Sequence, residues 1–312
     1  MISSHLADQH DTNHSRYVGR FAPSPTGPLH FGSLVCALAS FLHAKQAQGK
    51  WLVRIEDIDT PRVDTSMTSK ILDTLAAHGL YWDDAPIKQS ERSEFYERYL
   101  QKLANINTLY GCRCTRKQIK ARAAFYDRYC ADLHLPFEGS AIRWMNNKRA
   151  STFTDNHYGP LNVNHHITIE DPVLKRADGI YAYHLAVLTD DIEQGVNHIV
   201  RGADLIDMTP LHLSLYEALE QRAPAYLHVP IAVDESGQKL SKQQRAQALD
   251  NACAVKNLKS ALVFLGVTQN ALPSITSVSQ LIDWSIQNWQ VAHMSTAREI
   301  LVSQKNGVYS IA

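Results

Sequence analysis

The most constraining feature of the sequence is a proline-rich loop near its start, Ala22-Pro23-Ser24-Pro25-Thr26-Gly27-Pro28. Three prolines and a glycine within seven residues force an extended, rigid conformation. Residues 17–21 before the loop are typical of a β-strand, and apolar residues at 30–48 recur with helical spacing. The loop is therefore expected to connect a strand to a helix.

The next segments extend this pattern. Residues 51–55 predict a buried strand, and residues 64–78 predict a helix that ends at Gly79. A strand, loop, helix, strand and helix in this order are typical of the opening of a parallel, nucleotide-binding α/β sheet. An α+β arrangement with an antiparallel sheet is the alternative that this pattern leaves open.

The rest of the chain changes character several times. Residues 111–178 are rich in His, Asn and Arg, as expected of an insertion, whereas 179–188 and 198–201 predict further strands. A helix is expected after Thr209-Pro210, with Thr as its cap. A turn-rich loop at 232–242 precedes a region that predicts mostly amphipathic helix.

Length and composition exclude several classes of protein. The chain has 312 residues, of which 45% are hydrophobic and 20% charged, which favours a soluble globular protein with one large divided domain or two domains. No apolar run approaches the roughly 18–20 residues of a membrane span. The polar residues 1–15 are expected to be a disordered tail rather than a signal peptide. We therefore expect a cytoplasmic protein. Lys and Arg (31) balance Asp and Glu (31), which argues against binding nucleic acid through bulk charge.

Two short motifs predict a phosphate-binding site. His30, Gly32 and Ser33 stand at the start of the first predicted helix, where unpaired N–H groups attract phosphate. Far along the chain, Lys239 and Lys242 lie on a loop that can close over a triphosphate. Each motif alone is weak, because a helix-start His without a ligand and a solvated Lys pair are both common.

In combination, the two motifs resemble the HIGH and KMSKS signatures of class I aminoacyl-tRNA synthetases. The loop at 20–27 is similar to its glutamyl-tRNA synthetase form, and 54–59, 181–184 and 200–204 continue the match, so the resemblance covers about residues 16–250. It implies an α/β fold with a Rossmann-type parallel sheet, a zinc-containing insertion and a C-terminal helical region. It implies two catalytic halves, at 16–110 and 179–235, with a zinc-binding, acceptor-facing insertion between them at 111–178. The last division, 236–312, would hold a KMSKS-like loop and a helical stem-contact-like region.

The length of the chain indicates which members of this family it resembles most. Bacterial glutamyl-tRNA synthetases carry a large helical anticodon-binding domain that the residues after 242 cannot hold, so the chain resembles the truncated glutamyl-Q tRNA(Asp) synthetases. That resemblance implies activation of L-glutamate with ATP and Mg²⁺ without tRNA, then transfer to queuosine in the anticodon stem-loop of tRNA(Asp) by a monomer that binds no membrane. The alternatives are an abbreviated glutamyl-tRNA synthetase that charges the 3′ end of tRNA(Glu), a small-molecule adenylyltransferase, and a non-catalytic RNA-binding relative.

The resemblance also implies site residues. The guanidinium groups of Arg20 and Arg201 match carboxylates, although which arginine reads which carboxylate stays open; Glu56 suits the ammonium group and Tyr183 adds a phenol. The implied glutamate-binding residues are Arg20, Phe21, Ala22, Pro23, Ser24, Glu56, Tyr183 and Arg201. The implied catalytic and ATP-binding residues are His30, Gly32, Ser33, Lys239 and Lys242.

Three clustered cysteines predict a metal site. Cys112, Cys114 and Cys130 are three of five cysteines in a chain without an export signal, and three thiolates favour one structural Zn²⁺. On a helix, Tyr126, Cys130 and His134 would face one way. The family pattern implies Tyr126 as the fourth ligand, while His134, chemically the easier ligand, and a metal-free cysteine cluster are the alternatives.

Two basic segments offset the neutral overall charge. Residues 111–130 carry six Lys and Arg against Asp127, and 239–259 carry five against Asp250. Such segments are often only solvated surface, but here they predict local contacts with an anticodon stem-loop.

Overall fold

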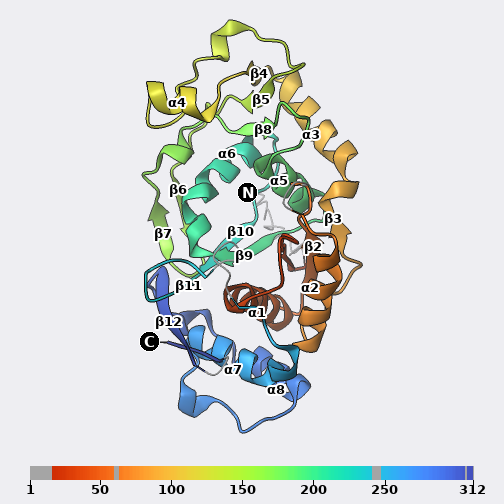
Figure 1. Ribbon diagram of the computed structural model, residues 1–312, viewed down its shortest axis with the longest axis vertical. Coiled ribbons are helices and arrows are strands. Elements are labelled where there is room, and N and C mark those ends of the chain that lie inside the picture. The colour runs from red at the N-terminus through yellow and green to blue at the C-terminus, as the bar shows by residue number, and fades with distance from the viewer. Residues whose placement is uncertain (1–15, 60–62, 241–246, 306–307, 312) are drawn as a thin grey trace, which may run out of the picture.

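The computed structural model describes residues 16–59, 63–240, 247–305 and 308–311; the expected tail at 1–15 lies outside them. Its centre is a β-layer made of two sheets (Figure 1). The first sheet has the order β1-β2-β3, with β1 (Val18–Phe21), β2 (Lys50–Ile55) and β3 (Ile87–Lys88). The second has the order β7-β6-β10-β9, with β6 (Thr152–Asp155), β7 (Gly159–Asn162), β9 (His198–Gly202) and β10 (Ala225–Val229).

The strands of this layer run parallel except at its edge. β1 pairs parallel with β2, β10 pairs parallel with both β9 and β6, and β7 runs antiparallel to β6. The two sheets meet where the Asn197 amide donates to the Val18 carbonyl over 3.1 Å. The predicted parallel sheet is therefore confirmed, and the antiparallel alternative is wrong for the central strands.

The first helices form as the sequence predicts. α1 (Phe31–Gln46) follows the proline-rich loop, and α2 (Ser66–Ala77) follows β2. α1 packs between the sheet and the C-terminal helices (Figure 1), where its buried side chains join the largest hydrophobic core. Inside this core the Ser40 hydroxyl donates to the Arg20 carbonyl over 3.1 Å and accepts from the Trp51 indole over 2.9 Å, which ties α1 to β1 and β2.

The strand predicted at 179–188 is wrong. The chain is extended only as far as Ala182 and then forms α5 (Tyr183–Glu193). Leu185, Leu188 and Ile192 are spaced for one face of a helix, and they pack with α3 (Ser93–Asn105) and α6 (Thr209–Ala218). A short apolar run fits either structure, so it misled the prediction. The helix expected at Thr209-Pro210 is confirmed as α6, but the predicted Thr cap is wrong, because Met208 is the N-cap and Thr209 is already helical.

The segment 111–178 contributes to two sheets. β4 (Leu109–Cys112), β5 (Ala141–Trp144) and β8 (Val173–Lys175) form an antiparallel sheet at the top of Figure 1, beside α4 (Arg116–Arg122). β6 and β7 of the same segment join the central layer, because Asp155 pairs in register with Tyr226 on β10.

The C-terminal region is only partly helical. α7 (Ala254–Phe264) and α8 (Val278–Asn288) confirm the predicted helices. The chain then forms β12 (Glu299–Lys305), which pairs parallel with β11 (Ile231–Val233) and antiparallel with β13 (Val308–Ile311). The prediction that the region is mostly helix missed this hairpin, although two alternating runs flank an Asn-Gly pair at 306–307 of the sequence, which is a hairpin signal.

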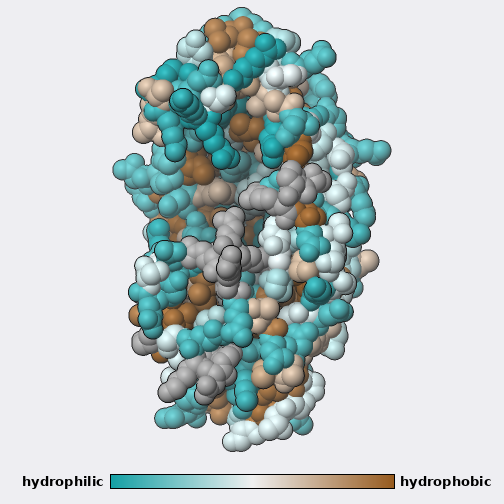
Figure 2. Space-filling model, viewed as in Figure 1, coloured by the Kyte–Doolittle hydropathy of each residue, from teal (hydrophilic) through white to brown (hydrophobic). Residues whose placement is uncertain are grey.

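The surface of the molecule is mostly polar. Figure 2 shows hydrophilic residues over most of one face and hydrophobic residues in small separate groups. None of the helices within the described ranges is both long and apolar enough to cross a membrane.

Candidate active site

A cleft of about 450 Å³ lies at the carboxyl ends of β1 and β9. This is the edge where parallel α/β sheets bind ligands, because the loops after the strands converge there. The cleft is lined by every predicted glutamate- and ATP-site residue that the structure describes: Arg20, Phe21, Ala22, Pro23, Ser24, His30, Gly32, Ser33, Glu56, Tyr183, Arg201 and Lys239. Lys242, the remaining predicted residue, lies outside the described residues.

One side of the cleft is formed by the start of α1. His30 is the N-cap of this helix, and its Nδ1 accepts from the Ser33 amide over 3.4 Å. Gly32 lies so close to its surroundings that a Cβ atom there would stand 3.3 Å from the His30 ring and 3.6 Å from the Leu240 carbonyl oxygen. Lys239 forms an ion pair with Asp204 across the cleft mouth. A helix N-terminus beside an ammonium group favours anionic ligands such as phosphate.

The opposite side rests on a buried network of ions. Arg20 donates from Nε to Asp191 over 3.1 Å, and the fully buried Arg54 donates from Nη1 to the same carboxylate over 2.8 Å. Arg54 also lies 3.6 Å from Glu56 and 3.7 Å from Asp190. Asp191 therefore holds Arg20 from behind while the cleft remains open in front of it.

Burial and charge oppose each other at Glu56 and Asp191. Burial raises the pKa of Glu56, and the nearby Arg54 and Arg20 only partly offset this effect. At Asp191 burial acts in the same direction, but Arg20 and Arg54 outweigh it and lower the pKa of the carboxyl. Glu56 is thus a carboxylate that lacks full compensation inside the protein, so a cationic group in the cleft would stabilise its charged form.

Aromatic and imidazole groups complete this wall. Burial raises the pKa of the Tyr183 phenol, so Tyr183 is a neutral hydrogen-bonding group at neutral pH. Next to it, His184 Nδ1 and His212 Nε2 lie 3.2 Å apart. Burial, with the charge of Arg201 as a further cause, lowers the pKa of His184 to about 4 and that of His212 well below its usual range. Both imidazoles are therefore neutral.

Several residues of the cleft and its support were missed in the sequence. Asp204 lines the cleft, and Asp190 and Asp191 support it from α5. The Asp190-Asp191 pair was a detectable signal, since two adjacent acids in an apolar segment need partners when they are buried. Because residues 179–188 were assigned to a strand, the helix that continues through Asp190 and Asp191 was not expected.

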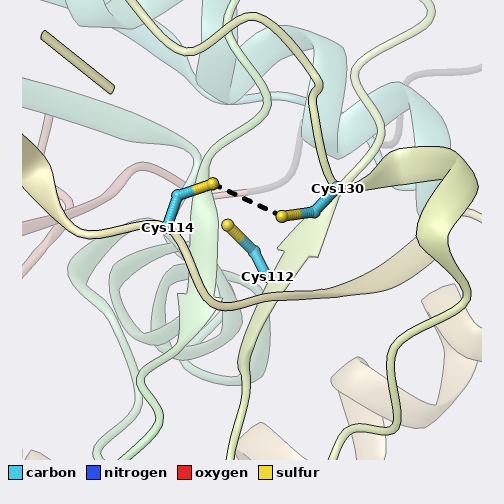
Figure 3. Close-up of side chains that lie close together, drawn as sticks. All are labelled: Cys112, Cys114 and Cys130. Carbon is cyan, nitrogen blue, oxygen red and sulfur yellow. Dashed lines mark hydrogen bonds between the residues drawn. The ribbon is translucent and has the colours of Figure 1, made fainter. Parts of the chain in front are cut away.

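A second candidate site lies in the insertion. Figure 3 shows the sulfur atoms of Cys112, Cys114 and Cys130 directed toward one another. Their Sγ atoms all lie within 4.8 Å of one another, with 3.4 Å between those of Cys114 and Cys130. Because sulfurs bound to one tetrahedral Zn²⁺ stand roughly 3.8 Å apart, this spacing fits a metal ion. None of the five cysteines, all of which lie among the described residues, forms a disulfide.

Tyr126 and His134 differ in their relation to the cluster. The Tyr126 hydroxyl accepts from the Cys130 amide over 3.1 Å and hydrogen-bonds with the Cys112 thiol, whereas His134 is exposed and does not belong to the cluster. The helix on which Tyr126, Cys130 and His134 would face one way does not form. Positive φ angles at Arg128 (60°) and His134 (50°) break it, and Tyr126 lies in a loop.

The basic residues of 111–130 separate into two groups. Arg128 is half-buried and donates to Asp171 over 2.7 Å, so it is a structural residue. The other five are exposed: Arg113, Arg116, Lys117, Lys120 and Arg122. Arg122 is paired with Asp127 over 3.0 Å, which leaves a smaller basic surface around α4 than the sequence count suggests.

Comparison with known proteins agrees with this geometry. The model of the class I tRNA synthetase (E and Q) catalytic domain matches residues 17–299. A glutamyl-Q tRNA(Asp) synthetase of Vibrio cholerae is 43% identical over 293 residues, which cover 93% of this chain and 96% of that protein. Another, of Shewanella oneidensis, is 45% identical over 287 residues, which cover 92% and 95%.

Solved structures lead to the same family. A crystal structure of a glutamate tRNA ligase from Elizabethkingia meningosepticum in complex with its amino acid has a TM-score of 0.74 and 27% identity. The match covers 90% of this chain and 66% of that chain, so the present chain spans about two thirds of that ligase.

Proposed function

Because the chain belongs to the glutamyl-Q tRNA(Asp) synthetase family of the class I tRNA synthetases, we propose that it activates L-glutamate with ATP without tRNA and transfers it to queuosine at the wobble position of tRNA(Asp). The observation that carries the proposal is the cleft, where two guanidinium groups, a partly buried carboxylate and a phenol adjoin a helix N-terminus. Glutamate has two carboxylates and one ammonium group, which such a set of side chains complements.

The proposed roles follow from charge. Arg20 and Arg201 bind the two carboxylates of glutamate, Glu56 binds its ammonium group, and Tyr183 adds a hydrogen bond. The backbone and side chains of Phe21, Ala22, Pro23 and Ser24 form the wall beside them. The ATP phosphates lie at the start of α1 and under the lysine loop, where the binding residues are His30, Gly32, Ser33, Lys239 and Lys242.

The chemistry is the formation and use of a mixed anhydride. An oxygen of the glutamate α-carboxylate attacks the α-phosphorus of ATP, and the bond to pyrophosphate breaks. His30 and the two lysines stabilise the charge that develops on the phosphate oxygens, while Mg²⁺ is carried mainly by those phosphates. A hydroxyl of the queuosine cyclopentenediol then attacks the acyl carbon, loses its proton, and AMP leaves.

We also propose one structural Zn²⁺ in the insertion. Cys112, Cys114 and Cys130 would supply three thiolates, and Tyr126 would supply the fourth ligand. The spacing of the three sulfurs and the contacts of the Tyr126 hydroxyl with Cys112 and Cys130 support this set. The metal would fix the segment between β4 and α4 relative to the turn at Cys130.

The remaining proposals concern the partner and the setting. The exposed basic residues around α4 support contact between the insertion and the anticodon stem-loop of tRNA(Asp). We propose a cytoplasmic monomer that is divided into catalytic halves at 16–110 and 179–235, an insertion at 111–178 and a loop with a stem-contact-like region at 236–312.

Glutamate-dependent exchange of pyrophosphate into ATP tests the activation step. Wild-type protein should catalyse exchange without tRNA, and Lys242→Ala should abolish it, because one charge-stabilising group is worth about 3–4 kcal/mol of the barrier. Lys256→Ala, which removes an exposed lysine on α7, is the matched control and should exchange normally. Normal exchange by Lys242→Ala would contradict the assigned role, and no exchange by wild type would favour a non-catalytic RNA-binding protein.

Transfer of labelled glutamate tests the acceptor. The proposal expects transfer to tRNA(Asp) that contains queuosine, and none to tRNA(Asp) without it or to tRNA(Glu). Transfer confined to tRNA(Glu) would identify an abbreviated glutamyl-tRNA synthetase instead.

A further inference from the structure

Three buried polar residues connect the β6–β7 hairpin with the cleft. Asp155 lies on β6, His228 on β10 and Arg201 on β9, which are neighbouring strands of one sheet. His228 and Arg201 are partners in the parallel register. Asp155 Oδ2 lies 2.7 Å from His228 Nδ1, and Arg201 Nε donates to His228 Nε2 over 3.1 Å. The three side chains thus form a continuous hydrogen-bonded chain across the sheet.

The partners at both ends define the tautomer of His228. The Nε of Arg201 always carries a proton and can only donate, so Nε2 of His228 must accept. Nδ1 must then carry the imidazole proton and donate it to the Asp155 carboxylate. Burial, with the charge of Arg201 as a further cause, lowers the pKa of His228 to about 4 despite the bond to Asp155, so the ring is neutral at neutral pH.

Asp155 is itself held in one orientation. Its Oδ1 accepts from the backbone amides of His157 and Tyr158, each over 2.9 Å, and its Oδ2 accepts from the His228 amide over 3.1 Å as well as from the ring. Both carboxylate oxygens are occupied, so the carboxylate cannot rotate without losing several hydrogen bonds. The direction of the chain from Asp155 to Arg201 is therefore fixed by the hairpin turn.

At the other end, the contacts of Arg201 leave one nitrogen for a ligand. Nε is bound by His228, and Nη2 donates to Thr209 Oγ1 over 2.7 Å and to the Leu205 carbonyl over 3.2 Å. Nη1 is buried and has no hydrogen-bond partner among the described residues, although Arg201 lines the cleft. The guanidinium plane also lies over the Tyr226 ring, 5.0 Å from its centroid. A buried donor without a partner needs an acceptor, and a substrate carboxylate is one.

We propose that Asp155 and His228 are positioning residues that select the orientation of Arg201 in which it binds a carboxylate of the substrate. Asp155 fixes the His228 tautomer, the tautomer provides the acceptor for Arg201 Nε, and the guanidinium then presents its unpaired N–H group to the cleft. The inference rests on the proposed role of Arg201 in glutamate binding, but the hydrogen-bonded chain itself can be tested without substrate.

The first test is Asp155→Asn. The new amide can still accept from the two backbone N–H groups, but it then presents N–H to His228 Nδ1, so the imidazole proton must move to Nε2 and face the N–H of Arg201. Loss of this buried acceptor should raise the KM for glutamate about 10- to 100-fold in pyrophosphate exchange, with little change in the KM for ATP or in kcat. An unchanged KM for glutamate in folded Asp155→Asn protein would overturn the proposal.

Substitutions of His228 separate positioning from folding. His228→Gln retains an acceptor for Arg201 and should keep the KM for glutamate within about fivefold of wild type, whereas His228→Leu should raise it as much as Asp155→Asn does. His78→Gln is the matched control, because His78 is an equally buried histidine that bonds to Thr74 and Asn257 away from the cleft. Equal KM values for His228→Leu and His228→Gln would contradict the proposal.

Nitrogen NMR of histidine-labelled wild-type protein reads the tautomer directly. The proposal expects the Nδ1–H form at His228, and an Nε2–H form would refute it even if Asp155→Asn and His228→Leu do not fold. If wild-type protein fails to activate glutamate while His228 has the expected tautomer, the proposed function is wrong and the hydrogen-bonded chain stands.

Discussion

Replacing Arg54 by Met should destabilise the protein far more than removing any exposed arginine. The network around Arg54 contains three guanidinium groups and three carboxylates, so its net charge is zero: Arg20, Arg54, Arg92, Glu56, Asp190 and Asp191. Their ion pairs span 2.5 to 3.7 Å, and Arg54 itself is completely buried. Arg54→Met leaves one negative charge uncompensated beneath the cleft.

The magnitude follows from this burial. Breaking a buried ion pair by removing one partner costs about 3–5 kcal/mol. For a chain of this size each kcal/mol corresponds to about 2 °C, so the Tm should fall by roughly 6–10 °C. Arg98→Met is the matched control, because Arg98 also pairs with a carboxylate of α5, Glu193, over 2.8 Å, but its side chain is 52% exposed. An exposed pair contributes at most about 1 kcal/mol, or roughly 2 °C.

The pH dependence provides the refuting measurement. Asp191 has a pKa held below its usual range by Arg20 and Arg54, so it contributes stability above its unfolded pKa and loses it as the pH falls through the folded pKa. In Arg54→Met one of these cations is gone, so the folded pKa of Asp191 rises and the variant takes up a proton at a higher pH than wild type. Calorimetry at pH 7 and pH 4 should therefore show a Tm deficit that narrows in acid. A deficit equal to that of Arg98→Met, or one that widens in acid, would refute the reasoning.

Three further predictions concern the two sites. Glu56→Gln should abolish glutamate-dependent exchange yet raise the Tm at pH 7, because burial raises the pKa of Glu56 and its ionised form therefore destabilises the fold. Calorimetry should show that this gain in Tm disappears as the pH falls through the raised pKa to the ordinary glutamate value. Elemental analysis should find one zinc per chain, little in Cys114→Ser, a reduced amount in Tyr126→Phe and no change in His134→Ala; full loading of Tyr126→Phe would exclude the phenol as a ligand. Gly32→Val should raise the KM for ATP about tenfold or more, because its side chain would crowd the His30 ring, and an unchanged KM would place the phosphates elsewhere.

Local signals predicted the elements that position the cleft. The prolines between residues 22 and 28, the helical spacing after His30 and the buried run before Glu56 all act within a few residues, so β1, α1 and β2 form where the sequence indicates. Parallel strands bring their carboxyl ends together, and the ligand-binding side chains lie at that edge of the sheet. That residues as distant as Arg20 and Arg201 share one site was implied by the family resemblance and not by these local signals.

Contacts between residues distant in the sequence could not be predicted from local sequence patterns, because they depend on strand register and burial. Arg201 and His228 stand 27 residues apart, and only the pairing of β9 with β10 places them side by side. Asp191 depends on the helical face of α5, which a short apolar run does not distinguish from a strand. The loop at Tyr126 fails as a helix because Arg128 turns back to bind Asp171, a residue much later in the chain.

The pairing of β11 with β12 has a consequence for synthesis of the chain. When the ribosome has completed Leu240, every described residue of the cleft has been made, yet β11, which includes cleft residues Ile231 and Ala232, still lacks its partner strand. That strand ends its pairing at Leu301, about 60 residues later, which takes roughly 3–12 s at ordinary elongation rates. The nascent protein thus holds every described residue of the cleft for seconds before the wall that carries Ile231 and Ala232 is completed.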